Sequence, residues 1–337
     1  MSPIGLVVPC RDEAAVIERK IEDLARARWP TGGGHRIVVV DDQSTDGTAA
    51  RAREAAARHF GNRADVVVDV VVNSVRAGKP GAVQTALDLL EPRVDLVVLT
   101  DADVLVEPGS LEALARAFAD DAGLAMACGA QRFLEDASEP FDRWTARVRR
   151  LESRSGRLFS VHGQLLAWRT DLGLRPRAGI AADDLDLMLQ ARTRVSPPRR
   201  VAVAPGAVFF ETKKPAGPAR RAQALRRARA YLQLVRSSSP RFPDALSRAQ
   251  WSFYRRVPPA VPTLAVVLPL AATLAAWILG GTGAGLASTF LFALVFTSPP
   301  GWRFAKLALR IRDANRLESE GSLSERWETD RCTTVRS

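Results

Sequence analysis

Two aspartates, Asp101 and Asp103, flank a single alanine directly after the largely apolar run 94–99. Such a run predicts a buried strand, and alternate residues of an extended chain point to the same side. Both carboxylates would then approach one hard cation, because Mg²⁺ and Mn²⁺ prefer oxygen ligands and commonly add phosphate oxygens and water. An isolated Asp-x-Asp also fits a solvated turn or a helix cap, so its companions decide between these interpretations.

Three further polar segments lie at the same kind of position. Asp12 and Glu13 follow the first apolar run, Asp42 follows the second, and Lys79 lies at the start of a later helix. Open α/β sheets bind their ligands at the carboxyl ends of the strands. We therefore expect all of these side chains to face one crevice together with Asp101.

The elements that position these residues alternate along the chain. Apolar runs that predict strands occur at 4–8, 37–40, 66–72 and 94–99, and helical stretches occur at 13–28, 46–60 and 80–90. The pattern continues with a helix at 108–120, a strand at 124–131, a helix at 139–157, a pair of strands at 158–168, a helix at 183–193, one or two strands at 200–210 and a basic helix at 218–236. This alternation predicts an α/β fold with a parallel sheet covered by helices on both faces.

Taken together, the motifs resemble glycosyltransferase family 2 over roughly residues 4–236. The resemblance rests on the Pro-x-x-x-Glu start at 9–13, the Asp-Asp-x-Ser-x-Asp-Gly-Thr turn at 41–48, the Gly-Lys-x-x-Ala-type segment at 78–82 and the Asp101-Ala102-Asp103 motif. Members of this family are inverting nucleotide-sugar transferases of the hexosyltransferase type. The resemblance therefore implies the GT-A fold, whose Rossmann-like sheet is mixed and mostly parallel, and a divalent metal, Mg²⁺ or Mn²⁺.

The resemblance also implies a donor site for a nucleotide-diphosphate sugar. Its implied members are Asp12 or Glu13 and Asp42 at the nucleoside, Lys79 near the diphosphate, Asp101 near the ribose and Asp103 as metal ligand. Carboxylates can accept hydrogen bonds from base N–H groups and ribose hydroxyls, which agrees with these roles. Helix capping explains the neighbouring Ser44, Thr45 and Asp46.

The second half of the chain supplies the acceptor side of the resemblance. The segment 182–187 resembles the family's Glu-Asp-x-Asp-Leu stretch, with Asp183 in place of Glu, which implies that Asp184 is the general base. Acids at a helix start also stabilise the helix dipole, and we keep that interpretation for Asp183 and Asp186. Gly163 matches a glycine beside the acceptor pocket. His162 either contacts acceptor or metal or makes a local hydrogen bond, and the local role is the commoner one for a lone histidine.

A basic segment at 213–229 precedes the apolar part of the chain. It resembles the Gln-x-x-Arg-Trp motif of processive members through Gln223 and Arg226, but Arg227 replaces the tryptophan. The loss of this aromatic platform speaks against processive polymer synthesis. The arginines would bind the leaving diphosphate, or form a basic helix face that contacts anionic lipid, or do both.

The segment between Arg256 and Arg303 contains no charged residue. Its two apolar stretches, 257–280 and 286–298, are separated by a glycine-rich turn and are long enough to predict a transmembrane helical hairpin. Basic residues on both sides place both ends in the cytoplasm. A buried soluble hairpin and a re-entrant segment are the alternatives. The expected organisation is a catalytic domain at 1–236, a linker or interfacial helix at 237–256, two spans within 257–300 and a cytoplasmic tail at 301–337, with the catalytic domain on the cytoplasmic side of the membrane.

Charge and cysteine content restrict the remaining classes. The net charge of +11 is not accompanied by a nucleic-acid-binding signature, so we expect a membrane and a nucleotide sugar as partners and no nucleic acid. The three scattered cysteines predict no disulfide framework. The acceptor is expected to be a hydroxyl or lipid-linked group. Two alternatives stay open: a noncatalytic nucleotide-binding scaffold of a polysaccharide assembly, and a nucleotidyltransferase, which would release pyrophosphate.

Overall fold

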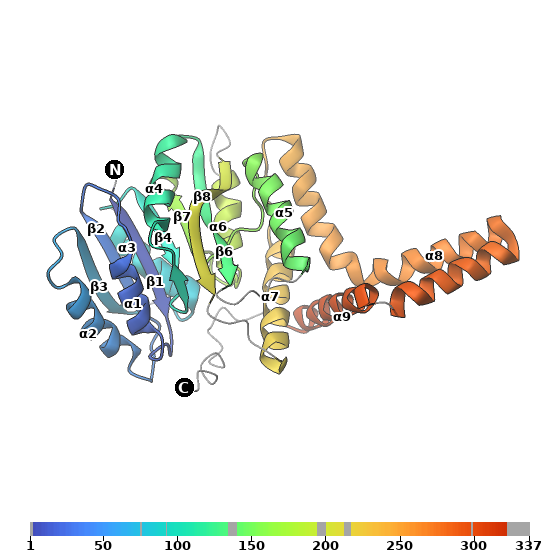
Figure 1. Ribbon diagram of the computed structural model, residues 1–337, viewed down its shortest axis with the longest axis horizontal. Coiled ribbons are helices and arrows are strands. Elements are labelled where there is room, and N and C mark those ends of the chain that lie inside the picture. Colours follow the sequence, from blue (N-terminus) through green and yellow to red (C-terminus); the bar gives the residue numbers. More distant parts are fainter. Residues whose placement is uncertain are drawn as a thin grey trace. The chain divides into compact units, whose positions relative to one another are not determined.

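The computed structural model describes residues 3–74, 76–91, 93–133, 140–193, 200–211, 217–297 and 299–321 (Figure 1). These residues divide into two compact units, 3–211 with Pro240–Pro243 and 217–239 with 244–321. The basic residues Lys213 and Lys214 and the predicted tail beyond 321 lie outside the described part of the chain.

The first unit alternates strands and helices. In chain order its elements are β1 (Ile4–Cys10), α1 (Ile17–Arg26), β2 (His35–Asp41), α2 (Thr48–Phe60), β3 (Val66–Val72), α3 (Lys79–Leu90), β4 (Leu96–Thr100), β5 (Val104–Val106), α4 (Ser110–Asp120), β6 (Leu124–Phe133), α5 (Pro140–Arg154), β7 (Leu165–Arg169), the 3₁₀ turn η1 (Thr170–Leu172), α6 (Asp183–Thr193) and β8 (Arg200–Glu211).

The described strands form one sheet in the order β3-β2-β1-β4-β7-β6-β8-β5. Strands β1 to β4 are mutually parallel, whereas β7 runs antiparallel between β4 and β6, and β5 runs antiparallel to β8. The prediction of a mixed, mostly parallel sheet flanked by helices is therefore confirmed. Because β1 to β4 are parallel, their carboxyl ends meet at one edge of the sheet, and β7 begins at that same edge.

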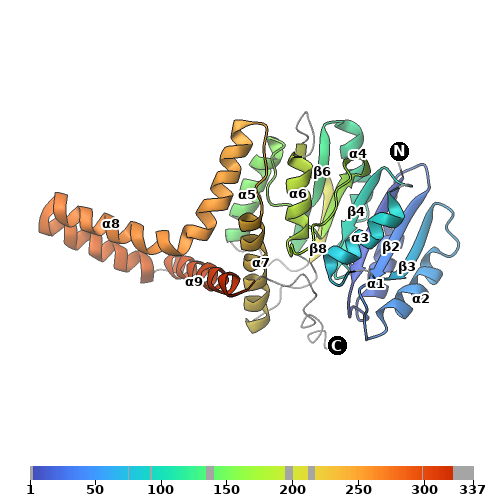
Figure 2. The same cartoon turned by 180° about the vertical axis from the view of Figure 1, so that it is seen from behind.

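Helices cover both faces of this sheet. Alternate residues of β1, including Ile4, Leu6 and Val8, join one core cluster with apolar residues of α1, α2 and α4. The other face carries α3 and α6 (Figure 2). On this face Gly5 leaves the space that Leu90 of α3 fills, because a Cβ at Gly5 would lie 2.9 Å from that side chain. The alternation of inward positions therefore builds a core on each side of the sheet.

Two strands differ from the sequence prediction. Only β7 forms in the segment 158–168, where we expected a pair of strands. Strand β5 was not predicted, and it has three residues directly after the Asp-x-Asp motif. Val104 of β5 pairs with Glu211 of β8, more than a hundred positions away in sequence. A pairing of this separation leaves no periodic signal in a local window, so it was not visible in the sequence.

The second unit consists of α7 (Gly217–Ser237), α8 (Ala245–Thr297) and α9 (Pro299–Glu320). The sequence analysis assigned 218–236 to the catalytic domain, whereas the structure groups α7 with the two later helices. Arg229 donates a hydrogen bond to the carbonyl of Gly321 at 3.0 Å, and Arg236 donates to Asn315 at 2.8 Å. These contacts between α7 and the end of the described chain hold the unit together. Helix α8 begins at Ala245, so it includes part of the segment 237–256 that was predicted as a linker or interfacial helix, as well as the apolar stretch that begins at 257.

Helix α8 is interrupted at Gly281, whose backbone has φ 69° and ψ −170°. The Ser288 hydroxyl lies 3.4 Å from the Thr273 hydroxyl, and a side chain at position 285 would collide with the Trp277 ring. The segments on either side of the break therefore lie side by side. One stretch among the described helices, Ala245–Phe290, is long and apolar enough to cross a membrane.

Candidate active site

The carboxyl edge of β1 to β4 gathers most of the polar residues that the sequence analysis selected. Asp12, Asp42 and Asp101 come one or two residues after the ends of β1, β2 and β4. Thr100, the last residue of β4, pairs with Leu165, the first residue of β7. This register brings the loop before β7, which contains Gly163, to the end of β4.

The loops after β1 and β2 are bonded to each other. The backbone N–H of Asp12 donates to the Ser44 hydroxyl at 2.8 Å, and the Asp12 carboxylate accepts from the N–H of Thr45 at 2.9 Å. The N–H of Glu13 donates to the Thr48 hydroxyl at 2.9 Å. Of the three residues expected to cap α2, Asp46 accepts from the Thr48 N–H at 3.0 Å, whereas Ser44 and Thr45 bond to Asp12. The contacts of Asp12 and Glu13 with a nucleoside stay a prediction.

Asp42 is fully buried at the centre of a second network. One carboxylate oxygen accepts from the N–H of Gly78 at 2.7 Å and lies 3.4 Å from Arg11, and the other accepts from the Asn73 amide at 2.7 Å. The same amide group donates to the carbonyl of Arg76 at 2.6 Å. Asn73 was missed in the sequence analysis, although it directly follows the run 66–72 and obeys the same strand-end rule as the acids. Asp42 and Asn73 together hold the loop that leads to Lys79.

Glycines shape this loop. The backbone of Gly78 has φ 101°, a conformation that favours glycine. Gly81 approaches the loop so closely that a Cβ there would lie 1.8 Å from the carbonyl oxygen of Arg76. That carbonyl is the one that Asn73 binds. Gly78 and Gly81 therefore allow α3 to begin directly against the loop.

Gly81→Ala is expected to destabilise the protein by about 1–3 kcal/mol, because the added methyl group pushes the Arg76 carbonyl away from Asn73. Urea unfolding followed by circular dichroism measures this change. Gly109→Ala is the matched control, since its methyl group meets only the end of the exposed Arg28 side chain, and we expect a change within about 0.5 kcal/mol. Equal stability of the two variants would contradict the prediction.

Lys79 links the loop to the Asp-x-Asp motif and to α6. Its ammonium lies 2.7 Å from Asp101 and 3.9 Å from Asp183. Burial alone would lower the pKa of Lys79, but the carboxylates of Asp101 and Asp183 raise it above its ordinary value. Lys79 therefore stays protonated at neutral pH. Its pairing with Asp101 and Asp183 was not foreseen from the sequence.

Asp184 lies at the start of α6 and is half-buried. The backbone N–H of Gly163 donates to its carboxylate at 3.3 Å. Burial and the neighbouring Asp183 raise the pKa of Asp184 to about 6, against an opposing effect of Lys79. Burial likewise raises the pKa of Asp183. A carboxylate with a pKa close to neutrality is suited to accept a proton in catalysis.

Asp186 has a different environment from Asp184. It is fully buried, accepts from the Arg177 backbone N–H at 2.9 Å and pairs with the Arg177 guanidinium at 2.6 Å. Gln190 also donates to it at 3.1 Å and to the carbonyl of Arg175 at 2.7 Å. Asp186 therefore anchors the loop before α6 and thereby fixes the helix end that carries Asp184.

Comparison with known proteins identifies the family of this chain. The family model described as Glycosyltransferase like family 2 matches residues 2–231. The chain belongs to this family. No match was found among curated proteins.

Solved structures resemble this glycosyltransferase over most of its length. The mannosyltransferase PcManGT from Pyrobaculum calidifontis, in complex with GDP-Man and Mn²⁺, is 25% identical with a TM-score of 0.68, and the match covers 94% of this chain and 87% of that one. S. aureus TarS 1-349, in complex with UDP-GlcNAc, is 16% identical with a TM-score of 0.52, and the match covers 95% and 92% of the two chains. The second likeness concerns the fold alone.

The remaining predicted residues of the glycosyltransferase lie as follows. Asp103 is exposed, and no group of three or more His, Cys, Asp or Glu side chains within the described ranges is arranged to hold a metal. The ring of His162 packs edge-on against Phe209, with centroids 5.5 Å apart. Gln223, Arg226 and Arg227 lie on α7 in the second unit, and their role in the site stays a prediction.

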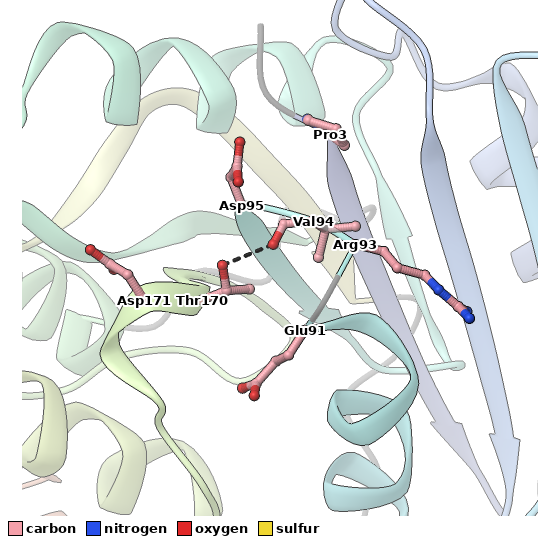
Figure 3. A pocket seen from close by; sticks show the side chains of 7 residues that line it. All are labelled: Pro3, Glu91, Arg93, Val94, Asp95, Thr170 and Asp171. Carbon is pink, nitrogen blue, oxygen red and sulfur yellow. Dashed lines mark hydrogen bonds between the residues drawn. The ribbon is translucent and has the colours of Figure 1, made fainter.

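A cavity of about 450 Å³ lies at the opposite edge of the sheet (Figure 3). It is lined by residues that precede β1 and β4 and follow β7, among them Pro3, Asp95 and Asp171. The Thr170 hydroxyl donates to the Val94 carbonyl at 2.8 Å in its wall. The cavity is thus separated from the candidate active site by the length of the strands.

Proposed function

We propose that this family 2 glycosyltransferase moves a sugar from a nucleotide-diphosphate donor to an acceptor hydroxyl with inversion at the anomeric carbon. The observation that carries the proposal is the position of Asp184. Its carboxylate accepts the N–H of Gly163, its pKa is raised to about 6, and it lies next to the ion pair of Lys79 and Asp101. A base and a phosphate-binding cation are thereby available within one site.

In the proposed reaction Asp184 takes the proton of the acceptor hydroxyl. The acceptor oxygen forms a bond to the anomeric carbon while the bond from that carbon to the diphosphate oxygen breaks, and its electron pair leaves with the nucleoside diphosphate. Lys79, which stays protonated between Asp101 and Asp183, binds a diphosphate oxygen in this reaction. Asp12, Glu13 and Asp42 form the nucleoside side of the site.

The donor set fits a divalent cation that arrives with the nucleotide. Mg²⁺ and Mn²⁺ are commonly held by one or two carboxylates plus phosphate oxygens and water, so the exposed Asp103 is a sufficient protein ligand. Asp101 is engaged by Lys79, and we assign it the ribose side rather than the metal. When bound, the cation takes up charge that develops on the leaving diphosphate.

A panel of nucleotide sugars with Mn²⁺ or Mg²⁺ tests the proposal through released nucleoside diphosphate. GDP-mannose is the first member of the panel, since PcManGT is similar along most of the chain. We expect release with one donor class and a requirement for the metal. Release of pyrophosphate would identify a nucleotidyltransferase instead, and no turnover with any donor would favour a scaffold.

The kcat/KM of transfer is expected to rise with pH and to reach half of its plateau near pH 6. The reason is that Asp184 must be ionised to accept a proton, and its pKa is raised to about 6. Lys79 stays protonated throughout the neutral range, because its pKa is raised above the ordinary lysine value, so its titration does not lower kcat/KM there. Initial rates at subsaturating acceptor between pH 4.5 and 8.5 give the profile. A profile that stays near its plateau down to pH 4.5 would contradict the assignment of Asp184.

We also propose that α8 attaches the enzyme to a membrane and that the acceptor is lipid-linked. Support comes from its exposed apolar side chains and from the absence of charge between Arg256 and Arg303. A double variant, Leu268→Arg with Leu274→Arg, is expected to lose flotation with lipid vesicles, since each arginine costs about 2.5–3.5 kcal/mol within a bilayer. Leu246→Arg, at the start of the same helix, is the matched control and should still float. Equal flotation of both proteins would contradict insertion.

A further inference from the structure

Lys20 of α1 is a fully buried lysine that the proposed mechanism does not use. Its side chain is among the largest fully buried side chains of the described residues. The ammonium donates to the Thr100 hydroxyl at 2.9 Å and to the Val104 carbonyl at 2.9 Å. Thr100 ends β4 and Val104 begins β5, so one ammonium group holds both ends of the Asp101-Ala102-Asp103 turn.

A second residue of α1 extends this attachment. The Asp23 carboxylate lies 4.0 Å from the Lys20 ammonium and accepts a hydrogen bond from the backbone N–H of Val106 at 2.9 Å. The pair of Lys20 and Asp23 therefore ties α1 to the end of β4 and to both ends of β5. Two charged side chains make this attachment, although apolar side chains could fill the same space.

A packing role alone does not account for the charge. Burying an ammonium is costly, and an apolar side chain of similar volume usually serves the core at least as well. Burial lowers the pKa of Lys20 to about 8, while Asp23, Asp101 and Asp103 act in the opposite direction. The ammonium is thus within electrostatic reach of both acids of the motif.

We propose that Lys20 is a positioning residue that fixes the Asp101-Ala102-Asp103 turn and thereby sets the geometry at which Asp103 binds the divalent cation. The first part stands on the contacts of Lys20, whereas the second rests on the proposed function. Removal of a group that orients a metal ligand commonly lowers the metal affinity by about 10–100-fold. Lys20 does not touch substrate and acts through the turn.

Hydrogen exchange of the metal-free protein tests the first part. In Lys20→Met the amides of residues 101–104 are expected to exchange about ten-fold faster, because the turn loses its two anchors. Ile21→Val, a buried neighbour on the same helix, is the control for general loosening and should leave these amides unchanged. Equal exchange of this segment in Lys20→Met and in the parent protein would overturn the proposal. Thr100→Val, which removes one acceptor of the ammonium with little change in shape, replaces Lys20→Met if that variant does not fold.

Mn²⁺ titration tests the second part. The probe is Mn²⁺ with GDP or with UDP, and the free Mn²⁺ signal in electron paramagnetic resonance reports binding without turnover. We expect Lys20→Met to raise the half-saturating Mn²⁺ concentration about ten-fold or more, with Ile21→Val close to the parent protein. If the parent protein binds Mn²⁺ and Lys20→Met binds it equally well, the role of Lys20 is overturned but the proposed function is not. A parent protein that takes up no Mn²⁺ with either nucleotide overturns the proposed function, and the metal part of this proposal with it.

Discussion

Asp184→Asn is expected to reduce kcat by about 10²–10⁴-fold while the affinity for the nucleotide donor stays within a factor of about two. The amide keeps the size of the side chain and still accepts the N–H of Gly163, but it cannot take a proton from the acceptor. Steady-state rates and isothermal titration with the nucleoside diphosphate separate the two effects. Asp171→Asn, in the cavity at the opposite edge of the sheet, makes the same chemical change and should retain full activity.

The same variant is expected to be more stable than the parent protein above pH 6. The folded-state pKa of Asp184, about 6, lies above its ordinary value of 3.8, so the fold favours the protonated carboxyl group. The stability that this group contributes is present below about pH 4 and is lost as the pH rises through about 6. Asparagine stays neutral, so the free energy of unfolding of Asp184→Asn should exceed that of the parent protein by up to about 2 kcal/mol near pH 8. The difference should vanish near pH 4. A less stable Asp184→Asn at pH 8 would contradict the raised pKa.

Asp103→Ala is expected to lower kcat/KM by about 10²–10³-fold at saturating Mn²⁺, because the metal loses its protein ligand and with it several kcal/mol of stabilisation of the leaving diphosphate. The half-saturating Mn²⁺ concentration should rise as well, which Asp184→Asn should not cause. Activity measured over a Mn²⁺ series gives both values. Asp120→Ala, an exposed aspartate at the end of α4, is the control and should match the parent protein. A metal-independent loss in Asp103→Ala would contradict its assignment as a ligand.

The two variants therefore separate two halves of the proposed chemistry. Loss of Asp103 should weaken nucleotide and metal together, whereas loss of Asp184 should affect only the chemical step. If both variants lost donor binding equally, the two residues would belong to one binding surface, and the base would have to be sought elsewhere.

The fold and the edge that carries the site could be predicted because both follow from local rules. Apolar runs of strand length predicted β1, β2 and β4, which end at Cys10, Asp41 and Thr100, and parallel strands place the following residues at one edge of the sheet. The positions of Asp42 and Lys79 at this edge followed from element type and order, whereas Asp184 was selected through the resemblance to the family. Their bonds to one another were not predicted, because these depend on loop conformations such as the positive φ of Gly78.

Lys20 and Asn73 show why other residues were missed. A lysine in a helix is expected to face solvent, but Lys20 lies on the buried face of α1 with Ile17 and Ile21, and its partners are about 80 positions away. Asn73 obeys the strand-end rule, but its burial depends on the bond to Asp42, which lies 31 positions away. In both cases the stabilising partner is distant in sequence, and burial of a polar group is explained only once that partner is known.

The antiparallel course of β7 has a consequence for the diversity of such enzymes. Because Leu165 pairs with Thr100, the register of β4 and β7 sets the backbone spacing between the Gly163 loop and Asp101. In the proposed reaction, this backbone spacing is the one between the donor and the acceptor. Chimeras that exchange segments around an intact β4 and β7 test whether this spacing can be kept while donor and acceptor change.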